Sequence, residues 1–179
     1  MSAILKTDRL ILREWRLDDL EAFAAMSADP NVMQFLTVDG NPDSRFGAWR
    51  ALCGMVGHWQ LRGFGLFAVV ERDTGAFVGR IGPWEPEGWP DFEIGWTLAS
   101  AYWGRGYATE AVKECLRYAF TELNRPHVSS FIVPENVRSI RVAERVGERL
   151  EGTTILPHMP DRPVLQYGVS RAVWLQRVR

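Results

Sequence analysis

Cysteine is scarce in this chain, with Cys53 and Cys115 the only two among 179 residues. Two cysteines cannot supply the disulfide framework that holds many small secreted domains together, and Cys115 falls on the apolar stripe of an expected helix. We therefore expect both cysteines to be reduced core residues. This usage favours a cytoplasmic protein.

The chain also lacks long apolar runs and an excess of charge of either sign. Nowhere do roughly 18 apolar residues follow one another, and residues 1–15 contain no stretch typical of a secretion signal. Lysine and arginine number 21 against 22 aspartates and glutamates, so the net charge is −1. Without a strong overall field, neither nucleic acid nor a membrane is an expected partner.

Several motifs of catalysis and ligand binding are missing. His58, His127 and His158 have no metal-ligand spacing with either cysteine, so no metal site is expected. The chain has neither the G-x-S-x-G sequence of serine hydrolases nor the G-x-x-x-x-G-K-S/T phosphate loop. The dinucleotide pattern G-x-G-x-x-G fails at Thr109, where a third glycine is required.

The apolar pattern predicts one α/β domain over residues 1–179, since no low-complexity linker divides the chain. Alternation predicts strands and spacings of three and four predict helices. The expected strands are 9–15, 64–71, 76–84, 91–98, 128–133, 150–156 and 164–173, with a loop at 157–163. The expected helices are 18–29, 31–36, 43–61, about 108–123 and 137–146. Because a helix joins strands 91–98 and 128–133, a right-handed crossover should pair them in parallel within a mostly antiparallel sheet.

The functional interpretation centres on the stretch from Asp91 to Leu123. A strand leads into the turn Gly104-Arg105-Gly106-Tyr107-Ala108-Thr109, and a helix follows. The two glycines let backbone approach a ligand, and the first N–H groups of a helix attract an anion such as a phosphate or pyrophosphate. A plain strand-to-helix turn with convenient glycines is the alternative.

Two longer segments carry a resemblance to a known family. WTLASAYWGRGYATEAV, followed after a helix and a strand by VPENVRSIRVAERVGERLEG, resembles the GNAT superfamily of acyl-coenzyme A N-acyltransferases, specifically its RimJ/RimL-like branch. The opening TDRLILREW and the closing VLQYGVSRAVWLQ are also similar to that branch. The resemblance implies a single GNAT-like α/β (α+β) domain. Its central sheet is mixed and mostly antiparallel, with about six to seven strands, one parallel splayed strand pair and flanking helices.

The resemblance also implies acetyl-coenzyme A as co-substrate. In the family a Q/R-x-x-G-x-G/A pattern lays backbone N–H groups around the pyrophosphate, and it falls here on Trp103 to Ala108 with Trp103 in the Q/R position. In the family's Asn-x-x-Ser, matched by Asn136 and Ser139, the asparagine meets the pantetheine arm and the serine lies near the thioester sulfur. From the residues alone, Asn136 is more simply a helix N-cap. The expected coenzyme-binding residues are Trp96, Thr97, Leu98, Trp103, Gly104, Arg105, Gly106, Tyr107, Ala108, Thr109, Asn136 and Ser139.

Amide formation from a thioester requires a neutral amine, a positive site for the oxyanion and a proton for the thiolate. Because an α-amino group has a pKa of about 8, a carboxylate that accepts its proton is useful. Glu93 matches the position of the glutamate proposed as base in ribosomal-protein acetyltransferases of this branch; a solvated strand carboxylate is the alternative. N–H groups around Trp96 to Leu98 are candidates for the oxyanion site. Ser139 is the candidate acid, and Glu148, where the family more often has phenylalanine, is expected to affect local packing only.

The expected activity is transfer of acetyl from acetyl-coenzyme A to a primary amine by direct attack, in a monomer or homodimer. A non-catalytic acyl-coenzyme A sensor or scaffold is the alternative. The acceptor is a protein N-terminus, an amino acid, a polyamine or an amino-sugar drug. Aromatic residues of helix 43–61 and of segment 84–89 are expected to wall its site.

Overall fold

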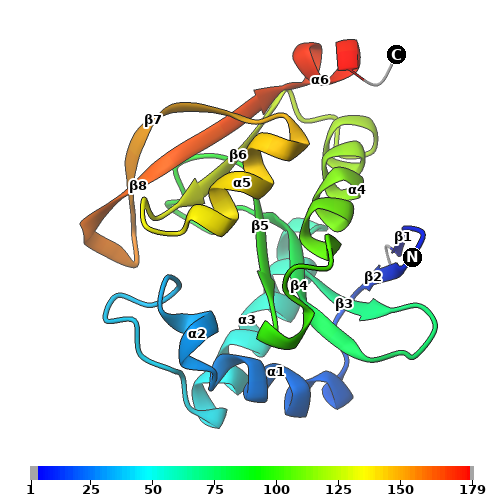
Figure 1. The fold of residues 1–179 in the computed structure, drawn as a ribbon, viewed down its shortest axis with the longest axis vertical. Coiled ribbons are helices and arrows are strands. Elements are labelled where there is room, and N and C mark those ends of the chain that lie inside the picture. Colours follow the sequence, from blue (N-terminus) through cyan, green and yellow to red (C-terminus); the bar gives the residue numbers. More distant parts are fainter. Residues whose placement is uncertain (1–3, 178–179) are drawn as a thin grey trace.

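The computed structural model describes residues 4–177. Within that range eight strands form one sheet in the order β1-β2-β3-β4-β5-β6-β8-β7, and only β5 and β6 pair in parallel (Figure 1). The strands are β1 (Leu5–Lys6), β2 (Leu10–Arg13), β3 (Phe67–Glu71), β4 (Phe77–Trp84), β5 (Glu93–Leu98), β6 (His127–Ile132), β7 (Arg149–Leu156) and β8 (Met159–Ser170).

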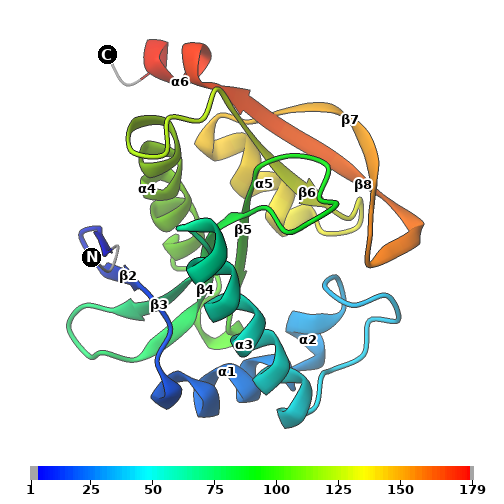
Figure 2. The same cartoon turned by 180° about the vertical axis from the view of Figure 1, so that it is seen from behind.

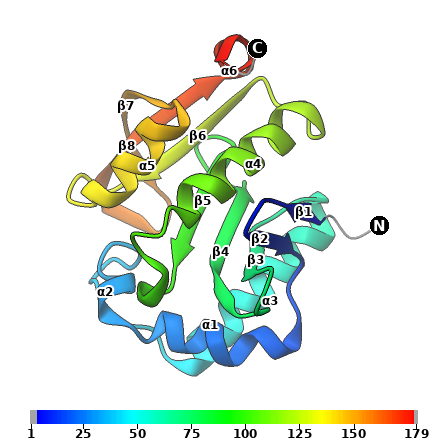
Figure 3. The same ribbon diagram turned by 45° about the vertical axis from the view of Figure 1, so that its right-hand side comes forward.

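Helices cover both faces of this sheet. They are η1 (Leu17–Asp19), α1 (Leu20–Ser27), α2 (Pro30–Met33), α3 (Arg45–Arg62), η2 (Ser100–Tyr102), α4 (Tyr107–Thr121), α5 (Val137–Val146) and α6 (Arg171–Arg177). Helix α3 crosses the face turned to the viewer in Figure 2, whereas α4 and α5 lie next to each other on the other face (Figure 3). None of the helices in residues 4–177 is long and apolar enough to cross a membrane.

Two hydrophobic clusters join the helices to the sheet. On one face Ala111, Val112 and Cys115 of α4 are fully buried against β4 and β5 residues such as Ile81 and Ile94. On the other face a second cluster joins α1 and α3 to the sheet and contains Phe23, Leu52, Met55, Leu66 and Ala68. The strands in between therefore present one face to each helical layer, as their alternation predicts.

The predicted fold class and the parallel strand pair are confirmed, and the sheet has more strands than expected. The two-residue β1 is too short to give an alternating pattern, so the sequence did not predict it. The predicted loop 157–163 was wrong, because β8 already begins at Met159. The strand predicted over 164–173 also ends earlier than expected, because β8 stops at Ser170 and Arg171 starts α6.

Cys53 is exposed, so its predicted place in the core was wrong, while that of Cys115 is confirmed. The buried face of α3 consists of Ala48, Leu52, Met55 and His58. Each helical residue is turned about 100° from the one before, so the neighbour of Leu52 faces away from the sheet. The apolar residues of α3 are spaced too widely around the helix to identify one buried face, so the sequence wrongly placed Cys53 on it.

Candidate active site

The parallel neighbours β5 and β6 part soon after they meet. Their pairing consists of Glu93 opposite Ser129, whereas β4 and β5 stay paired along all of β5. The N–H of Ser129 donates to the Phe92 carbonyl at 2.9 Å, and the Ser130 hydroxyl lies 2.9 Å from the Ile94 carbonyl oxygen. Beyond these contacts the strands diverge (Figure 1). The edge of β5 past Ile94 therefore faces a gap.

Backbone alternation decides which groups of β5 face this gap. The N–H of Ala99 donates to the Val78 carbonyl at 3.0 Å, so odd-numbered residues turn their backbone groups toward β4. Trp96 and Leu98 accordingly turn theirs toward the gap, whereas Thr97 contributes only its side chain there. Of the three strand residues expected at the coenzyme, two can offer a backbone N–H.

A cavity of about 440 Å³ fills the gap. Five of the expected site residues line it, namely Glu93, Trp96, Thr97, Asn136 and Ser139. Its remaining wall comes from segments far apart in the chain. These lining residues are Phe35, Leu36, Leu66, Arg80, Trp84, Pro86, Trp89, Ile94, Gly95, Ser130, Phe131, Ile132, Val133, Leu156, His158, Met159 and Val164.

Glu93 is held inside this cavity. Trp89 Nε1 donates to its Oε2 at 2.8 Å, and the ring of Trp89 stacks on His158 with centroids 5.4 Å apart. Burial raises the pKa of Glu93 to about 7, although the Trp89 hydrogen bond, the Phe131 N–H and the charge of Arg80 oppose the rise. Its surroundings differ from those of a solvated strand carboxylate. A carboxyl that titrates near neutral pH can both accept and release a proton there.

Asn136 and Ser139 meet at the start of α5. The Ser139 N–H donates to Asn136 Oδ1 at 3.2 Å, so Asn136 is the N-cap that the residues alone favoured. Trp96 Nε1 donates to the Ser139 hydroxyl oxygen at 3.2 Å. Because that oxygen accepts the indole proton, the hydroxyl's own proton is available to another acceptor in the cavity.

The glycine-rich turn leaves the start of α4 open. Gly104 has φ +76° and Gly106, the N-cap, has φ +80° with no side-chain cap. The first bond inside the helix runs from the Glu110 N–H to the Gly106 carbonyl at 3.0 Å. The N–H groups of Tyr107, Ala108 and Thr109 therefore precede the helical hydrogen-bond ladder. This is the open helix N-terminus that suits an anion.

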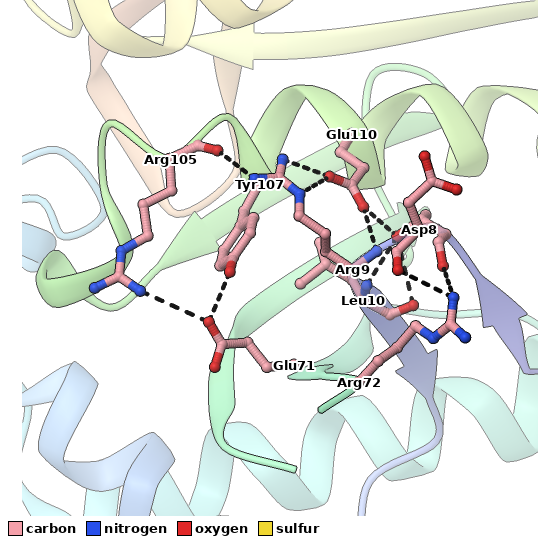
Figure 4. Close-up of polar contacts among 9 residues, drawn as sticks. Asp8, Arg9, Leu10, Glu71, Arg72, Arg105, Tyr107 and Glu110 are labelled. Carbon is pink, nitrogen blue, oxygen red and sulfur yellow. Dashed lines mark hydrogen bonds and ion pairs between the residues drawn. The ribbon is translucent and has the colours of Figure 1, made fainter. Parts of the chain in front are cut away.

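Arg9, which directly precedes β2, and Glu71 of β3 hold this turn in place (Figure 4). The Arg9 guanidinium donates to Glu110 Oε2 from Nε at 2.7 Å and to the Arg105 carbonyl from Nη1 at 3.0 Å, and it lies 4.6 Å from the Tyr107 ring centre. Tyr107 donates its hydroxyl proton to Glu71 Oε1 at 2.6 Å. The sequence did not predict a role for Arg9 or Glu71. The likeness of TDRLILREW to the family was the signal for Arg9, and Glu71 lies outside that segment.

Trp103 has a role that the sequence did not predict. Its Nε1 donates to the Leu98 carbonyl at 2.9 Å, and the Arg138 guanidinium lies 4.6 Å from the centre of its ring. The residue in the usual Gln/Arg position therefore ties the end of β5 to the turn and to α5.

Glu148 does more than pack locally, which corrects the expectation from sequence. It is 2% exposed, its Oε1 lies 3.1 Å from the Ser130 hydroxyl oxygen, and its Oε2 has no partner among residues 4–177. The Ser130 hydroxyl donates to Glu148 Oε1 and also lies 2.9 Å from the Ile94 carbonyl oxygen. Burial raises the pKa of Glu148 to about 8, although the Ser130 hydrogen bond opposes the rise. The buried carboxyl is therefore mostly protonated near neutral pH.

Replacing Glu148 with glutamine should change how stability depends on pH. The pKa of this carboxyl rises from 4.5 to about 8 on folding, so its stabilising contribution is complete below the lower value and lost as pH passes the higher one. Relative to Glu148→Gln, the wild-type free energy of unfolding should fall by up to about 1.4 kcal/mol per pH unit in that window. Urea unfolding of both proteins across the window measures this; curves that stay parallel would contradict a protonated Glu148.

Comparison with known proteins agrees with this geometry. The family model described as "Acetyltransferase (GNAT) domain" matches residues 9–149. The chain belongs to the GNAT acetyltransferase family. This GNAT chain is 32% identical over 148 residues to the uncharacterized N-acetyltransferase YnaD of Bacillus subtilis (strain 168). The matched region covers 83% of this chain and 84% of YnaD.

Solved structures share the GNAT fold over almost the full length of the chain. An acetyltransferase from Agrobacterium tumefaciens str. C58 superposes with a TM-score of 0.81 at 30% identity, over 93% of this chain and 94% of that one. The ribosomal-protein-S5-alanine acetyltransferase from Vibrio fischeri superposes with a TM-score of 0.73 at 17% identity, over 96% of this chain and 98% of that one. At that identity the likeness concerns the fold alone.

The expected family and enzyme class are thereby confirmed. The chain is a GNAT acetyltransferase with a fold shared by ribosomal-protein acetyltransferases, and enzymes of this family use acetyl-coenzyme A.

Proposed function

We propose that this enzyme transfers acetyl from acetyl-coenzyme A to a primary amine by direct attack of the amine, as one cytoplasmic domain over residues 1–179. Glu93 carries the proposal, because it is a carboxyl inside the cavity with a pKa of about 7. A non-catalytic sensor would have no use for a titrating carboxyl at this point. The acceptor is a protein N-terminus or a small molecule, and the enzyme acts as a monomer or homodimer.

The proposed place of the coenzyme follows from the two open backbone edges. The pyrophosphate lies against the N–H groups of Tyr107, Ala108 and Thr109, where the helix N-terminus favours negative charge. The pantetheine arm enters the gap beside β5, next to the N–H groups of Trp96 and Leu98. Asn136 keeps its side-chain N–H₂ for this arm, because its Oδ1 caps α5.

In the proposed mechanism the amine nitrogen attacks the thioester carbon while Glu93 accepts a proton from that nitrogen. The carbonyl oxygen becomes an oxyanion close to a β5 backbone N–H, which is the kind of donor that stabilises it. The carbon–sulfur bond then breaks. Ser139 donates its proton to the thiolate and regains one, through water, from protonated Glu93, so both residues return to their starting state as an amide and free coenzyme A leave the site.

The test of this function is release of free thiol from acetyl-coenzyme A in the presence of a panel of primary amines and N-terminal peptides. We expect release that depends on the amine, with the acetylated amine identified by mass. A protein that binds acetyl-coenzyme A in a calorimeter but releases no thiol with any amine would instead be the sensor.

Trp84 and Trp49 provide a matched pair for the acceptor wall. Trp84 lines the cavity, whereas Trp49 is 40% exposed and no α3 residue lines the cavity, so the expected wall from helix 43–61 is corrected to segment 84–89. Helix α3 packs its inner face on the sheet and turns Trp49 outward. Trp84→Ala should raise the acceptor KM roughly tenfold and leave the acetyl-coenzyme A KM unchanged, because only the acceptor loses aromatic contacts.

Trp49→Ala is the control and should change neither KM. Trp84 also stacks on His58 with centroids 4.4 Å apart, so Trp84→Phe is measured beside it as a milder change. An equal rise in both KM values for Trp84→Ala, with melting temperature unchanged, would count against this wall.

A further inference from the structure

Arg80 of β4 shares the cavity with Glu93 and lies on the same face of the sheet. The register pairs Arg80 with Thr97 and Trp84 with Glu93. Between these two pairs stand Gly82 and Gly95, and Gly95 lines the cavity without a side chain to fill it. A Cβ at Gly95 would lie 3.4 Å from Glu93 Oε1, so the hollow borders the carboxyl directly. The cavity therefore has a cationic group and a carboxyl on its floor with open space between them.

The Arg80 guanidinium has no anionic partner among residues 4–177. Its Nη1 lies 3.9 Å from Met55 Sδ, and its guanidinium lies 5.9 Å from the centroid of the Phe23 ring. Burial lowers the pKa of Arg80, and the charge of Glu93 opposes this only in part. A guanidinium that loses part of its hydration without gaining a carboxylate is costly, and a bidentate carboxylate is the group that best relieves this cost.

The remaining ionisable group near Arg80 does not supply that anion. His158 also lines the cavity, and burial together with the charge of Arg80 lowers its pKa, so its imidazole is neutral near pH 7. Glu93 is bonded to Trp89 and serves the amine in the proposed function. The cavity thus offers one site for an amine and one unmatched site for an anion.

The side of the sheet on which Arg80 lies favours the acceptor as the source of the anion. Met55 and Phe23 belong to the cluster formed with α1 and α3. The open turn for the pyrophosphate belongs to α4, whose Tyr107 and Ala111 pack in the cluster on the other face. A phosphate held at that turn is therefore directed away from the Arg80 guanidinium.

We propose that the acceptor is an amine that also carries a carboxylate, and that Arg80 binds this carboxylate while the amine faces Glu93. This inference rests on the proposed acetyl transfer and names its substrate class. A free amino acid meets the requirement, and so does a peptide with an acidic first residue. A polyamine or an amino-sugar drug has no carboxylate and brings further positive charge toward Arg80, so both are disfavoured.

The experiment compares acceptors that differ only in the carboxylate. Each amino acid is assayed beside its primary amide and its decarboxylated amine, and a series of unbranched ω-amino acids measures the span between the two sites. Peptides that begin with Asp or Asn distinguish a peptide source from a free amino acid. We expect kcat/KM for the carboxylate form to exceed that for its amide by at least about tenfold.

Arg80→Met is the matched variant, because methionine keeps an unbranched apolar stem against Phe23 and Met55. It should lower kcat/KM for carboxylate acceptors by roughly 100-fold and for their amides by less than about threefold. The dissociation constant of acetyl-coenzyme A should stay unchanged. Arg80→Lys, which keeps the charge without the bidentate geometry, should retain part of the discrimination.

Amides that react as well as the acids in the wild-type enzyme would overturn the inference without any variant. The same holds if Arg80→Met weakens all acceptors equally or weakens acetyl-coenzyme A. A thermal shift with the same acids and amides tests binding without turnover. A shift that requires the carboxylate and is lost in Arg80→Met, with no thiol release from any amine, would support the anion site and overturn the proposed transfer.

Discussion

Replacing Glu93 by glutamine should lower kcat roughly 10²- to 10⁴-fold near neutral pH, the range expected when one general base is removed. Glutamine has nearly the same shape and can still accept the Trp89 indole proton, which Glu93 takes at 2.8 Å. The loss then reflects proton transfer rather than packing. Steady-state thiol release with a saturating amine measures it.

The pH profile separates a base from a structural carboxyl. A base must be ionised, and the pKa of Glu93 is about 7, so wild-type kcat/KM should rise as pH passes that value. The kcat/KM of Glu93→Gln should not show this rise with pH. At alkaline pH the amine arrives neutral and hydroxide can take its proton, so the two enzymes should converge. An unchanged profile with nearly full kcat would reduce Glu93 to a structural group and move the base to a water on the same strand face.

Ser139→Ala is the control that reports on the other end of the reaction. An acid toward the thiolate matters less as pH passes the thiol pKa of about 8.5, and its effect should grow with leaving-group basicity. Glu93→Gln should show no such dependence on the leaving group. The dependence of the rate on the leaving group therefore distinguishes the two variants even where their rates are similar.

Replacing Gly106 by valine should abolish acetyl-coenzyme A binding. Gly106 has φ +80°, which a β-branched residue rarely adopts, and its Cβ would stand at the open helix N-terminus proposed for the pyrophosphate. Isothermal calorimetry with acetyl-coenzyme A measures the loss. Undiminished binding by a folded Gly106→Val protein would remove this turn from the coenzyme site.

Gly63→Val controls for backbone strain. Gly63 ends α3 at φ +75° with open space around its Cβ position, and it stands outside the cavity wall. Both variants should lower the melting temperature, because both force a valine into the left-handed region. Only Gly106→Val should also lose acetyl-coenzyme A.

The sequence by itself determined the features that depend on neighbouring residues. Alternation along β5 was enough to turn Glu93 away from Phe92 and Ile94, because successive side chains of a strand point to opposite faces. Gly104 and Gly106 predicted the open turn, because such a turn depends only on the backbone conformation of neighbouring residues. The N-cap at Asn136 is likewise a contact across three residues. The helix between β5 and β6 predicted their parallel pairing through the handedness of such crossovers.

Only the tertiary structure decided where those strands part and which ionisable groups meet there. Arg80 lies in β4, Glu93 in β5 and Glu148 between α5 and β7. Their ionisation depends on burial and on partners that no local pattern encodes. Cys53 shows the same limit, because its spacing allowed burial but the packing of α3 turned it outward. The unmatched charge of Arg80 and the proton on Glu148 both depend on packing between segments far apart in the chain, which removes water from these side chains.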